Sequence, residues 1–343
     1  MKPKVSIIIL NWNGWKDTIE CLEAIYRTDY PNYNVIVVDN GSEDDSINMI
    51  RKYVKGEISV KSDFFEFNKD NKPIQMFEYE NNEYDSFINH EDEFENISSN
   101  KKLILIKNDY DSGFSVGNNI GINFAQEHLN IEYIMLLSND IIIAEDSLDK
   151  LITFASSDQK IGIVGPRVLY YDNPERTAYL GRKVNLYTAT TSDIYDEKES
   201  YSSTVEVDYV VGCGLLIKKS VIESIGTLNP NYFLYYEDVD WCTRARKNGY
   251  NIYSIPESKI WHKISSEESD SLTRYYYGSR NSFLFLKNNW SMALLLLFPV
   301  AILNNLLYSF TLILKGKRKA AITVLKSIYD GVKGNYGYKE GYN

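Results

Sequence analysis

The sequence is poor in cysteine, and its positive charge is outnumbered by its negative charge. The three cysteines, Cys21, Cys213 and Cys242, lie far apart without a Cys-x-x-Cys pair, and an odd number does not suit a framework of disulfides. A reducing compartment is therefore expected, which predicts a cytoplasmic protein. With 37 Lys and Arg against 47 Asp and Glu, the net charge of −10 argues against a nucleic-acid partner, because such a partner needs a clustered basic face.

Two local patterns are also missing. The apolar run at residues 5–10 is too short for a secretory signal and is not followed by a small-residue cleavage site, so we expect a strand there. No Gly-x-Gly-x-x-Gly follows an expected strand, which argues against a dinucleotide dehydrogenase.

What the sequence does contain is an alternation of short β-branched runs with helical patterns. The expected strands cover residues 5–10, 34–39, 103–106, 133–137, 161–164, 209–218 and 251–255. The expected helices cover about residues 15–27, 44–53, 117–128 and 239–248. This alternation predicts an α/β fold with a parallel sheet. Residues 56–100 are acidic, rich in Asn and without a clean period, so we interpret them as an insertion, and residues 171–203 as a surface excursion.

Polar residues follow four of the expected strands. They are Asn11-Trp12-Asn13, Asp39-Asn40-Gly41-Ser42, residues 108–113 and Ser138-Asn139-Asp140. Each group alone is explained by a turn, since turns favour Asn, Asp, Gly and Ser. Ligands of open parallel sheets bind outside the carboxyl ends of the strands, so four such ends in register predict a nucleotide crevice.

An acidic stretch followed by a basic helical turn is the most informative part of the sequence. It places three carboxylates within four residues, and His262 follows the strand-like residues 259–261. The acids are Glu237, Asp238 and Asp240, and the cations are Arg244, Arg246 and Lys247. A carboxylate within reach of a hydroxyl can act as a general base. Asp240 is equally explained as a carboxylate at a helix N-terminus, and Arg246 and Lys247 as solvated surface.

Together with the Gly/Asn-rich residues 112–121, these motifs resemble the family 2 glycosyltransferases of GT-A fold, and within them the rhamnosyltransferase-like branch. The resemblance covers residues 4–55 and 101–262, is weaker over 274–281, and does not cover 56–100. It implies a GT-A (Rossmann-like), mostly parallel central sheet flanked by helices in a catalytic domain of residues 1–265. Outside the resemblance, the apolar and amphipathic composition of the last part of the chain leads us to expect that residues 266–343 form a C-terminal helical, membrane-associating region.

The resemblance also implies roles for individual residues. Those expected to bind the donor are Asn11, Asp39, Asn40, Ser42, Gly113, Asn118 and Asn139, with Asp39 accepting the imide N–H of a uracil or thymine. Asp140 and His262 would be ligands of Mn²⁺ or Mg²⁺. Asp238 would be the catalytic base with Glu237 beside it. The residues expected at the acceptor are Asp240, Trp241 and Arg244.

This sequence departs from the family pattern at two positions. Asp111 stands where an Asn is commoner, and Ser138-Asn139-Asp140 keeps only the last acid of the Asp-x-Asp often found in this fold. A hard divalent cation commonly takes one or two protein carboxylates and fills its other positions with phosphate and water, so a metal site is still expected. Without the resemblance, His262 beside Trp261 is typical of a packed core histidine.

The expected function is that of an inverting glycosyltransferase. It would move a sugar from a UDP- or dTDP-sugar to a hydroxyl of a lipid-linked or polysaccharide acceptor, and rhamnose is suggested by the branch alone. One alternative is a catalytically degenerate nucleotide-sugar-binding module at the membrane, because Ser138-Asn139 replaces a first acid. The other is a sugar nucleotidyltransferase, although residues 11–15 lack the Gly-rich, Arg-containing loop of that class. The sequence predicts no oligomeric state.

The C-terminal region is expected to lie on the cytoplasmic face of the cell membrane. Residues 292–314 are long and apolar enough to span, but Pro299 and Asn304-Asn305 interrupt them and basic residues 315–319 follow. A single span would separate that basic cluster from the catalytic domain, so we expect re-entrant or in-plane helices. Ala321, Leu325 and Ile328 would form one face of an interfacial helix at 317–333, and cutting near residue 270 would release a soluble domain. A soluble, buried helical hairpin is the alternative.

Overall fold

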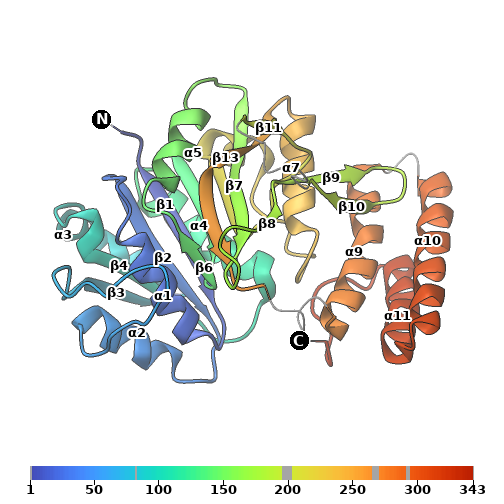
Figure 1. The fold of residues 1–343 in the computed structure, drawn as a ribbon, viewed down its shortest axis with the longest axis horizontal. Helices are drawn as coiled ribbons and strands as arrows, with labels where there is room; N and C mark the ends of the chain where they lie inside the picture. Colours follow the sequence, from blue (N-terminus) through green and yellow to red (C-terminus); the bar gives the residue numbers. More distant parts are fainter. Residues whose placement is uncertain (1, 82, 195–202, 265–269, 291–293, 343) are drawn as a thin grey trace.

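A computed structural model describes residues 2–81, 83–194, 203–264, 270–290 and 294–342. Among these residues, 11 strands form one twisted sheet and 2 strands form a separate hairpin. Helices cover both faces of the sheet, and three C-terminal helices stand at one end of the molecule (Figure 1). The order along the sheet is β11-β13-β7-β12-β5-β1-β2-β4-β3, with β6 and β8 attached to β13 and β7.

The half of the sheet built from the first part of the chain is parallel, as the sequence predicts. Its strands are β1 (Val5–Asn11), β2 (Tyr33–Asn40), β3 (Gln75–Glu80), β4 (Lys102–Asn108) and β5 (Tyr133–Ser138). The crossover helices are α1 (Trp15–Ile25), α2 (Ser46–Lys55) and α4 (Gly113–His128). In register, Asn11 is opposite Asp39 and Asn40 is opposite Asn108. The polar residues that end these strands therefore gather at one edge of the sheet.

The other half of the sheet is mixed. Its longer strands are β7 (Ile161–Tyr170), β12 (Gly214–Lys218) and β13 (Asn251–His262), and its shorter ones are β6 (Ile141–Ile143), β8 (Thr177–Tyr179) and β11 (Val205–Glu206). The helices here are α5 (Ser147–Ala155), α6 (Lys219–Ile225) and α7 (Glu237–Lys247). Strand β12 runs antiparallel between β5 and β7, while β13 runs parallel to β7.

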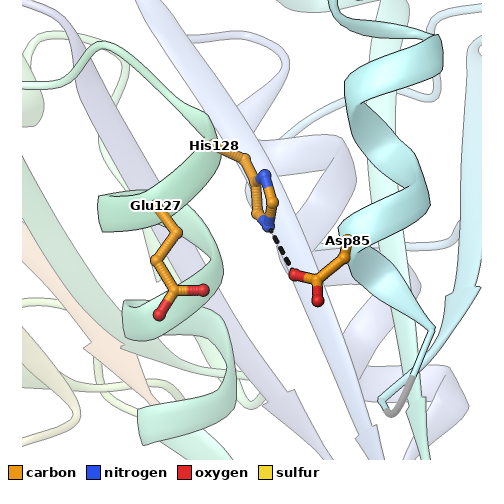
Figure 2. A group of neighbouring side chains, drawn as sticks. All are labelled: Asp85, Glu127 and His128. Carbon is orange, nitrogen blue, oxygen red and sulfur yellow. Dashed lines mark ion pairs between the residues drawn. The ribbon is translucent and has the colours of Figure 1, made fainter.

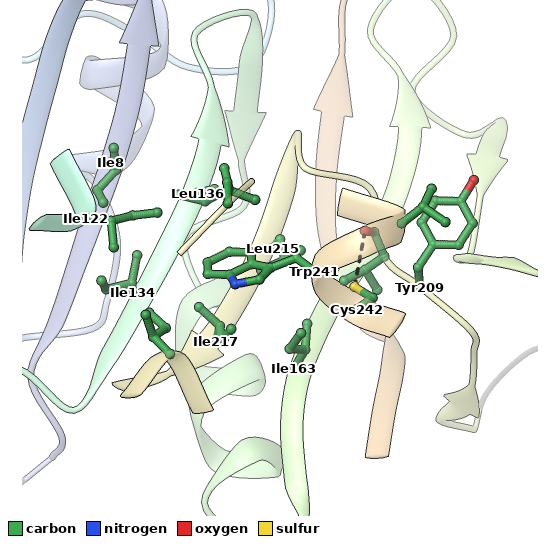
Figure 3. Packing of buried hydrophobic residues seen from close by; sticks show 14 of the residues in the cluster. Ile8, Ile122, Ile134, Leu136, Ile163, Tyr209, Leu215, Ile217, Trp241 and Cys242 are labelled. Carbon is green, nitrogen blue, oxygen red and sulfur yellow. Dashed lines mark hydrogen bonds between the residues drawn. The ribbon is translucent and has the colours of Figure 1, made fainter. Parts of the chain in front are cut away.

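Buried apolar side chains fill both faces of the sheet. On one face Trp241 of α7 lies fully buried against β12 and β5, among Leu215, Ile217 and Ile134 (Figure 3). Its indole nitrogen Nε1 donates a hydrogen bond to the carbonyl of Gly226 at 2.8 Å. This packing fixes the axis of α7, whose first turn reaches the carboxyl edge of the sheet.

The region expected as an irregular insertion contains regular structure. Strand β3 adds a parallel edge strand beside β4, and η1 (Tyr84–Asn89), α3 (Glu91–Glu95) and η2 (Ser99–Lys101) follow. Phe77 and Tyr79 alternate inward along β3, and their rings pack against Phe94 and Phe87. Alternation of these two rings with Glu78 and Glu80 is a two-residue period, but it is short and is lost when the acidic, Asn-rich segment is taken as a whole.

Residues 171–203 are likewise more than a surface excursion. They contain β8 and an antiparallel hairpin of β9 (Arg182–Asn185) and β10 (Thr190–Asp193), while residues 195–202 lie outside the described part. The hairpin extends from the sheet toward the C-terminal helices (Figure 1).

The C-terminal region forms α9 (Leu272–Asn289), α10 (Leu294–Leu314) and α11 (Arg318–Lys333). The predicted boundary at 265/266 falls among residues that are not described. By length and composition, Leu296–Leu314 is apolar enough to cross a membrane, with a mean hydropathy of 1.8 and 22% of it buried. The predicted outer face of α11 is wrong in two positions: Ala321 and Ile328 point inward and are buried, whereas Leu325 is exposed.

Candidate functional site

A cavity of about 550 Å³ opens at the carboxyl edge of the sheet. Its walls come from the ends of β1, β5 and β13, the first turn of α7, the β9–β10 hairpin and the start of α9. Polar lining residues include Asn139, Asp140, Arg182, Thr191, Tyr209, Glu237, Asp238, His262 and Arg274. Residues from opposite ends of the sequence thus face one space.

Asp140 and His262 form an acid–histidine pair in this cavity. Strand pairing explains it, because His262 at the end of β13 lies opposite Ile141 of β6, the residue after Asp140. The His262 Nε2 lies 3.1 Å from the Asp140 Oδ2, and both side chains are partly exposed. The His262 Nδ1 is buried beside Cys213, and none of the residues that the structure describes gives it a hydrogen bond of ordinary geometry.

This pair fits a divalent cation chemically. Burial lowers the pKa of His262, but neighbouring Cys213 and Asp140 outweigh burial and place it well above its ordinary value. A cation at the pair would replace that proton, since a metal ligand must be deprotonated. One carboxylate oxygen and one imidazole nitrogen leave positions for phosphate oxygens and water, as Mn²⁺ and Mg²⁺ require.

The two catalytic candidates open α7 after a strained turn. Tyr235 and Tyr236 both have left-handed backbones, with φ of 68° and 75°. Such a conformation costs a residue other than glycine about 1–3 kcal/mol, so the surroundings must hold it in place. Asn281 of α9 does so, since its Nδ2 donates to the carbonyls of Leu234 at 2.9 Å and Tyr235 at 2.8 Å.

Asp238 and Glu237 line the cavity in different surroundings. Asp238 accepts backbone hydrogen bonds from Gly212 at 3.1 Å and Val239 at 2.7 Å. Burial raises the pKa of Asp238, although these two N–H groups lower it again. For Glu237, burial and the nearby charge of Asp238 raise the pKa well above its usual range, and its Oε2 has no hydrogen-bond partner among the described residues. Asp238 is therefore the ionised member of the pair, with a basicity shifted toward neutral pH.

In metal-free protein, Glu237→Gln should make stability less dependent on pH. A raised folded-state pKa means that the folded protein holds this proton more tightly than the unfolded chain, whose Glu titrates near about 4.3. By linkage, the contribution of Glu237 to the free energy of unfolding falls as pH rises from about 4.3 to its folded-state pKa. Thermal unfolding of both proteins with a chelator, from about pH 4 to about pH 8, measures the difference. Parallel stability curves would contradict the raised pKa.

A second cavity, of about 530 Å³, adjoins the first, and Trp12 lines both. Asp39 and Ser42 lie in its wall. The Asp39 carboxylate is almost fully buried and accepts from the Asn11 Nδ2 at 2.6 Å and the Ser42 Oγ at 2.8 Å. The structure thus gathers three of the predicted donor-binding residues beside the space next to the metal candidates.

The other predicted donor-binding residues have mainly bracing contacts. Asn139 lines the larger cavity and donates to the Thr18 Oγ1 at 3.1 Å. Asn40 bonds Asp111 at 2.9 Å and thereby ties β2 to the start of α4. Asn118 donates to the Phe114 carbonyl within α4. Gly113 has φ of 80°, and a Cβ there would come within 2.4 Å of the Phe233 ring. Asn40, Gly113 and Asn118 line neither cavity and lie behind the walls.

The three residues expected at the acceptor lie away from both cavities. Trp241 is in the core, and Asp240 is buried with its Oδ2 2.8 Å from the Arg244 Nε. Arg244 also donates to the carbonyls of Ile225 and Thr227. The predicted acceptor role of these three residues is therefore corrected. Beyond the first turn of α7 their side chains face the interior, where they pack and hold the helix in place.

Several cavity residues were not found from the sequence. Arg182 and Thr191 come from the hairpin, Trp12 follows β1, and Arg274 begins α9. The Arg182 Nε lies 2.5 Å from the Asp193 Oδ1, which pins the two strands of the hairpin together beside Asp238. Of these residues, Trp12 alone stands in a polar strand end, Asn11-Trp12-Asn13, that was singled out from the sequence. Arg182, Thr191 and Arg274 reach the cavity through contacts between distant parts of the chain.

A second acid–histidine group lies elsewhere in the fold. Asp85, Glu127 and His128 offer ligand atoms within 4.8 Å of one another (Figure 2). Helix α4 starts at the carboxyl edge of the sheet and runs back, so His128 at its last turn lies at the opposite edge from Asp140. Asp85 and Glu127 are exposed, and the His128 Nε2 lies 3.3 Å from the Asp85 Oδ1, as in an ordinary ion pair.

A large α/β sheet flanked by helices, with further helices at its C-terminal end, matches the fold of solved glycosyltransferases of the GT-A class. A mannosyltransferase from Pyrobaculum calidifontis, solved with GDP-Man and Mn²⁺, has this fold. It aligns with a TM-score of 0.54 over 97% of this chain and 88% of its own, at 12% identity. That likeness concerns the fold alone and confirms the predicted fold class.

Residues 79–276 match the family described as glycosyltransferase-like family 2, and residues 6–78 match glycosyl transferase family 2. This chain therefore belongs to the family 2 glycosyltransferases. It is 30% identical over 180 residues to the low-salt glycan biosynthesis hexosyltransferase Agl10 of Haloferax volcanii, covering 50% of this chain and 56% of that protein. It is 25% identical to the dTDP-rhamnosyl transferase RfbF of Shigella flexneri, covering 55% and 64%. The matched regions span less than two thirds of both relatives.

Proposed function

We propose that this protein transfers a sugar from a nucleotide-sugar to a hydroxyl group with inversion at the anomeric carbon. The observation that carries the proposal is that the Asp140–His262 pair and Asp238 line one cavity of about 550 Å³. A cation ligand pair and a carboxylate base within one space are what metal-assisted displacement of a diphosphate needs.

Asp140 and His262 would hold Mn²⁺ or Mg²⁺, which when bound neutralises the charge of the departing nucleoside diphosphate. Asp238 accepts the proton of the acceptor hydroxyl as that oxygen attacks from the face opposite the leaving group. The raised pKa of Asp238 suits this role, because a stronger carboxylate base lies nearer to working pH. Glu237, held largely neutral by burial, adds no second negative charge beside the base.

The nucleotide would occupy the second cavity, with its base near Asp39 and its diphosphate reaching past Trp12 toward Asp140. A carboxylate at that place accepts the imide N–H of a uracil or thymine, so we propose UDP or dTDP as the carrier. The similarity to a dTDP-rhamnosyl transferase supports rhamnose as the sugar. For the acceptor, the similarity over 47% of this chain to an N-acetylglucosaminyl-diphospho-decaprenol L-rhamnosyltransferase of Mycobacterium tuberculosis supports a lipid-linked glycan.

The rival functions are less well supported. A degenerate binding module would not need to keep Asp140, Asp238 and His262 facing one space, as they do here. A sugar nucleotidyltransferase would need its Gly-rich, Arg-containing loop after β1, where residues 11–15 stand instead. We propose the cytoplasmic face of the cell membrane as the place of action, and a catalytic unit that extends from residue 1 through α9.

Donor hydrolysis is the test of this function. UDP- and dTDP-sugars would be incubated with the full chain and Mn²⁺, Mg²⁺ or chelator, and release of UDP or dTDP followed. We expect slow, metal-dependent release from one nucleotide class, since water can replace the acceptor. Donor binding without release, even when glycan acceptors are added, would favour the binding module. Release of pyrophosphate from a sugar phosphate and UTP or dTTP would favour the nucleotidyltransferase.

A further inference from the structure

Helices α10 and α11 form a hairpin whose outward side is apolar. The two helices pack on each other and on α9 through buried residues such as Ala301, Ala321 and Val324. Large apolar side chains remain outside, among them Leu303, Leu307, Phe310, Ile322, Leu325 and Tyr329, which are 44–64% exposed. A contiguous apolar surface of this kind marks a binding face, whereas singly scattered apolar residues do not.

The turn that joins the two helices is strongly basic. Lys315, Lys317, Arg318 and Lys319 lie within five residues, in a chain whose net charge is −10. The turn leads into α11, where Lys317 stands at the N-cap position but its side chain does not cap the helix, and the first turn has no acidic residue. Cations at a helix N-terminus oppose the helix dipole, so this end of the hairpin is stabilised by an added anion. Asp270, 2.6 Å from the Lys317 Nζ, supplies one negative charge.

A small hollow accompanies these charges. It has a volume of about 340 Å³ and lies between the start of α9 and the start of α11, with Lys317, Arg318 and Lys319 in its wall. Lys326 and Lys333 continue the positive charge along α11 beside the exposed apolar residues. Apolar side chains bordered by cations suit a bilayer surface, where the former enter the acyl boundary and the latter meet phosphates.

We infer that the outward face of the α10–α11 hairpin docks in the plane of an anionic lipid bilayer, with a lipid phosphate seated at the basic turn of residues 315–319. Charge complementarity selects this occupant. A second copy of this chain docked through the same face would offer the turn no exposed acid from α10 or α11, because Asp330, the acid of these helices, is buried. A neutral bilayer carries no net negative charge to attract the turn.

Docking in this way places the catalytic cavity close to the bilayer, a step that rests on the proposed function. Arg274 of α9 lines the cavity, and the next residue, Tyr275, contacts Tyr308 of α10 with ring centroids 6.2 Å apart. The first turn of α9 therefore lies between the hairpin and the cavity. A lipid-linked acceptor can remain in the bilayer while its glycan reaches Asp238.

The test is vesicle co-sedimentation of the full chain with phosphatidylcholine alone and with phosphatidylcholine plus phosphatidylglycerol. We expect binding to the anionic vesicles that weakens in high salt, and little binding to the neutral ones. Arg318→Gln with Lys319→Gln should weaken binding by about 30-fold, which is about 2 kcal/mol, because two cations that attract the anionic surface are lost. Leu303→Gln with Leu307→Gln should weaken it by removing the apolar insertion.

Lys52→Gln with Lys55→Gln is the matched control, because it removes two exposed cations from α2 at the other end of the molecule (Figure 1). Circular dichroism checks that each variant folds, and donor hydrolysis is measured separately, so loss of docking and loss of the proposed reaction are distinguishable. Equal binding by all proteins to both vesicles overturns the proposal. Binding that resists salt and is unchanged in every variant also overturns it, because it indicates a membrane-spanning helix. A dimer that dissociates in Leu303→Gln with Leu307→Gln overturns it as well, because the apolar face would then be a dimer interface.

Discussion

Asp238→Asn is expected to lower the rate of sugar transfer by about 10²–10⁴-fold, the usual contribution of a general base. Asparagine keeps the shape of the side chain but cannot accept the proton of the acceptor hydroxyl. Because both carboxylate oxygens accept backbone N–H groups, the variant also loses one of these bonds, at a cost of about 1–3 kcal/mol. Initial rates of transfer, donor-binding calorimetry and thermal unfolding measured on one preparation separate these effects.

Glu237→Gln is the matched control for that experiment. Within the described part of the chain nothing bonds the Glu237 Oε2, and burial holds this side chain largely neutral, so an amide of the same size should leave transfer nearly unchanged. If Asp238→Asn kept near-normal turnover while Glu237→Gln lost it, the base would be the neighbouring residue.

Asp140→Ala is expected to abolish the part of nucleotide binding that depends on metal. The carboxylate would hold the cation that bridges protein and diphosphate, so its removal weakens both metal and UDP or dTDP binding. We expect at least about a 10-fold loss, the lower limit for residues that only orient a metal ligand. Calorimetry of UDP and dTDP with Mn²⁺ and with chelator measures it.

The chelator arm is the internal control, because affinity that does not need metal should be equal in wild type and variant. His262→Ala should reproduce the loss in part, since it is the other proposed ligand. If UDP or dTDP binds equally tightly with Mn²⁺ and with chelator, and Asp140→Ala does not change that affinity, Asp140 is not a metal ligand.

The parallel half of the fold and the polar strand ends of the site could be predicted from the sequence. Strands such as β1 and β2 are buried on both faces and read as continuous apolar runs, and their polar ends at Asn11 and Asp39 are local. The family pattern then singled out Asp140, Asp238 and His262, and the structure brings these three into one cavity.

The rest depends on contacts between distant parts of the chain. Arg182 reaches the cavity only because its hairpin folds over the sheet, with the Tyr236 hydroxyl donating to the Ala189 carbonyl. The resemblance placed Trp241 at the acceptor, but packing against β12 turns its side chain into the core. The polarity and spacing of residues within one helix or strand do not predict which other helix or strand it will pack against.

Asn281 of α9 holds the strained turn before Asp238 in place. This contact limits where chimeras between members of this family can be joined. Arg280 beside it is buried and donates to the Asn281 Oδ1 and to the Gly337 carbonyl, so the chain's last residues also brace that hold. A chimera joined near residue 270 would separate the catalytic turn from its own brace, contrary to the clean release that the sequence suggests there. A chimera that keeps the turn in place would instead need to take α7, α9 and the segment around Gly337 from the same parent.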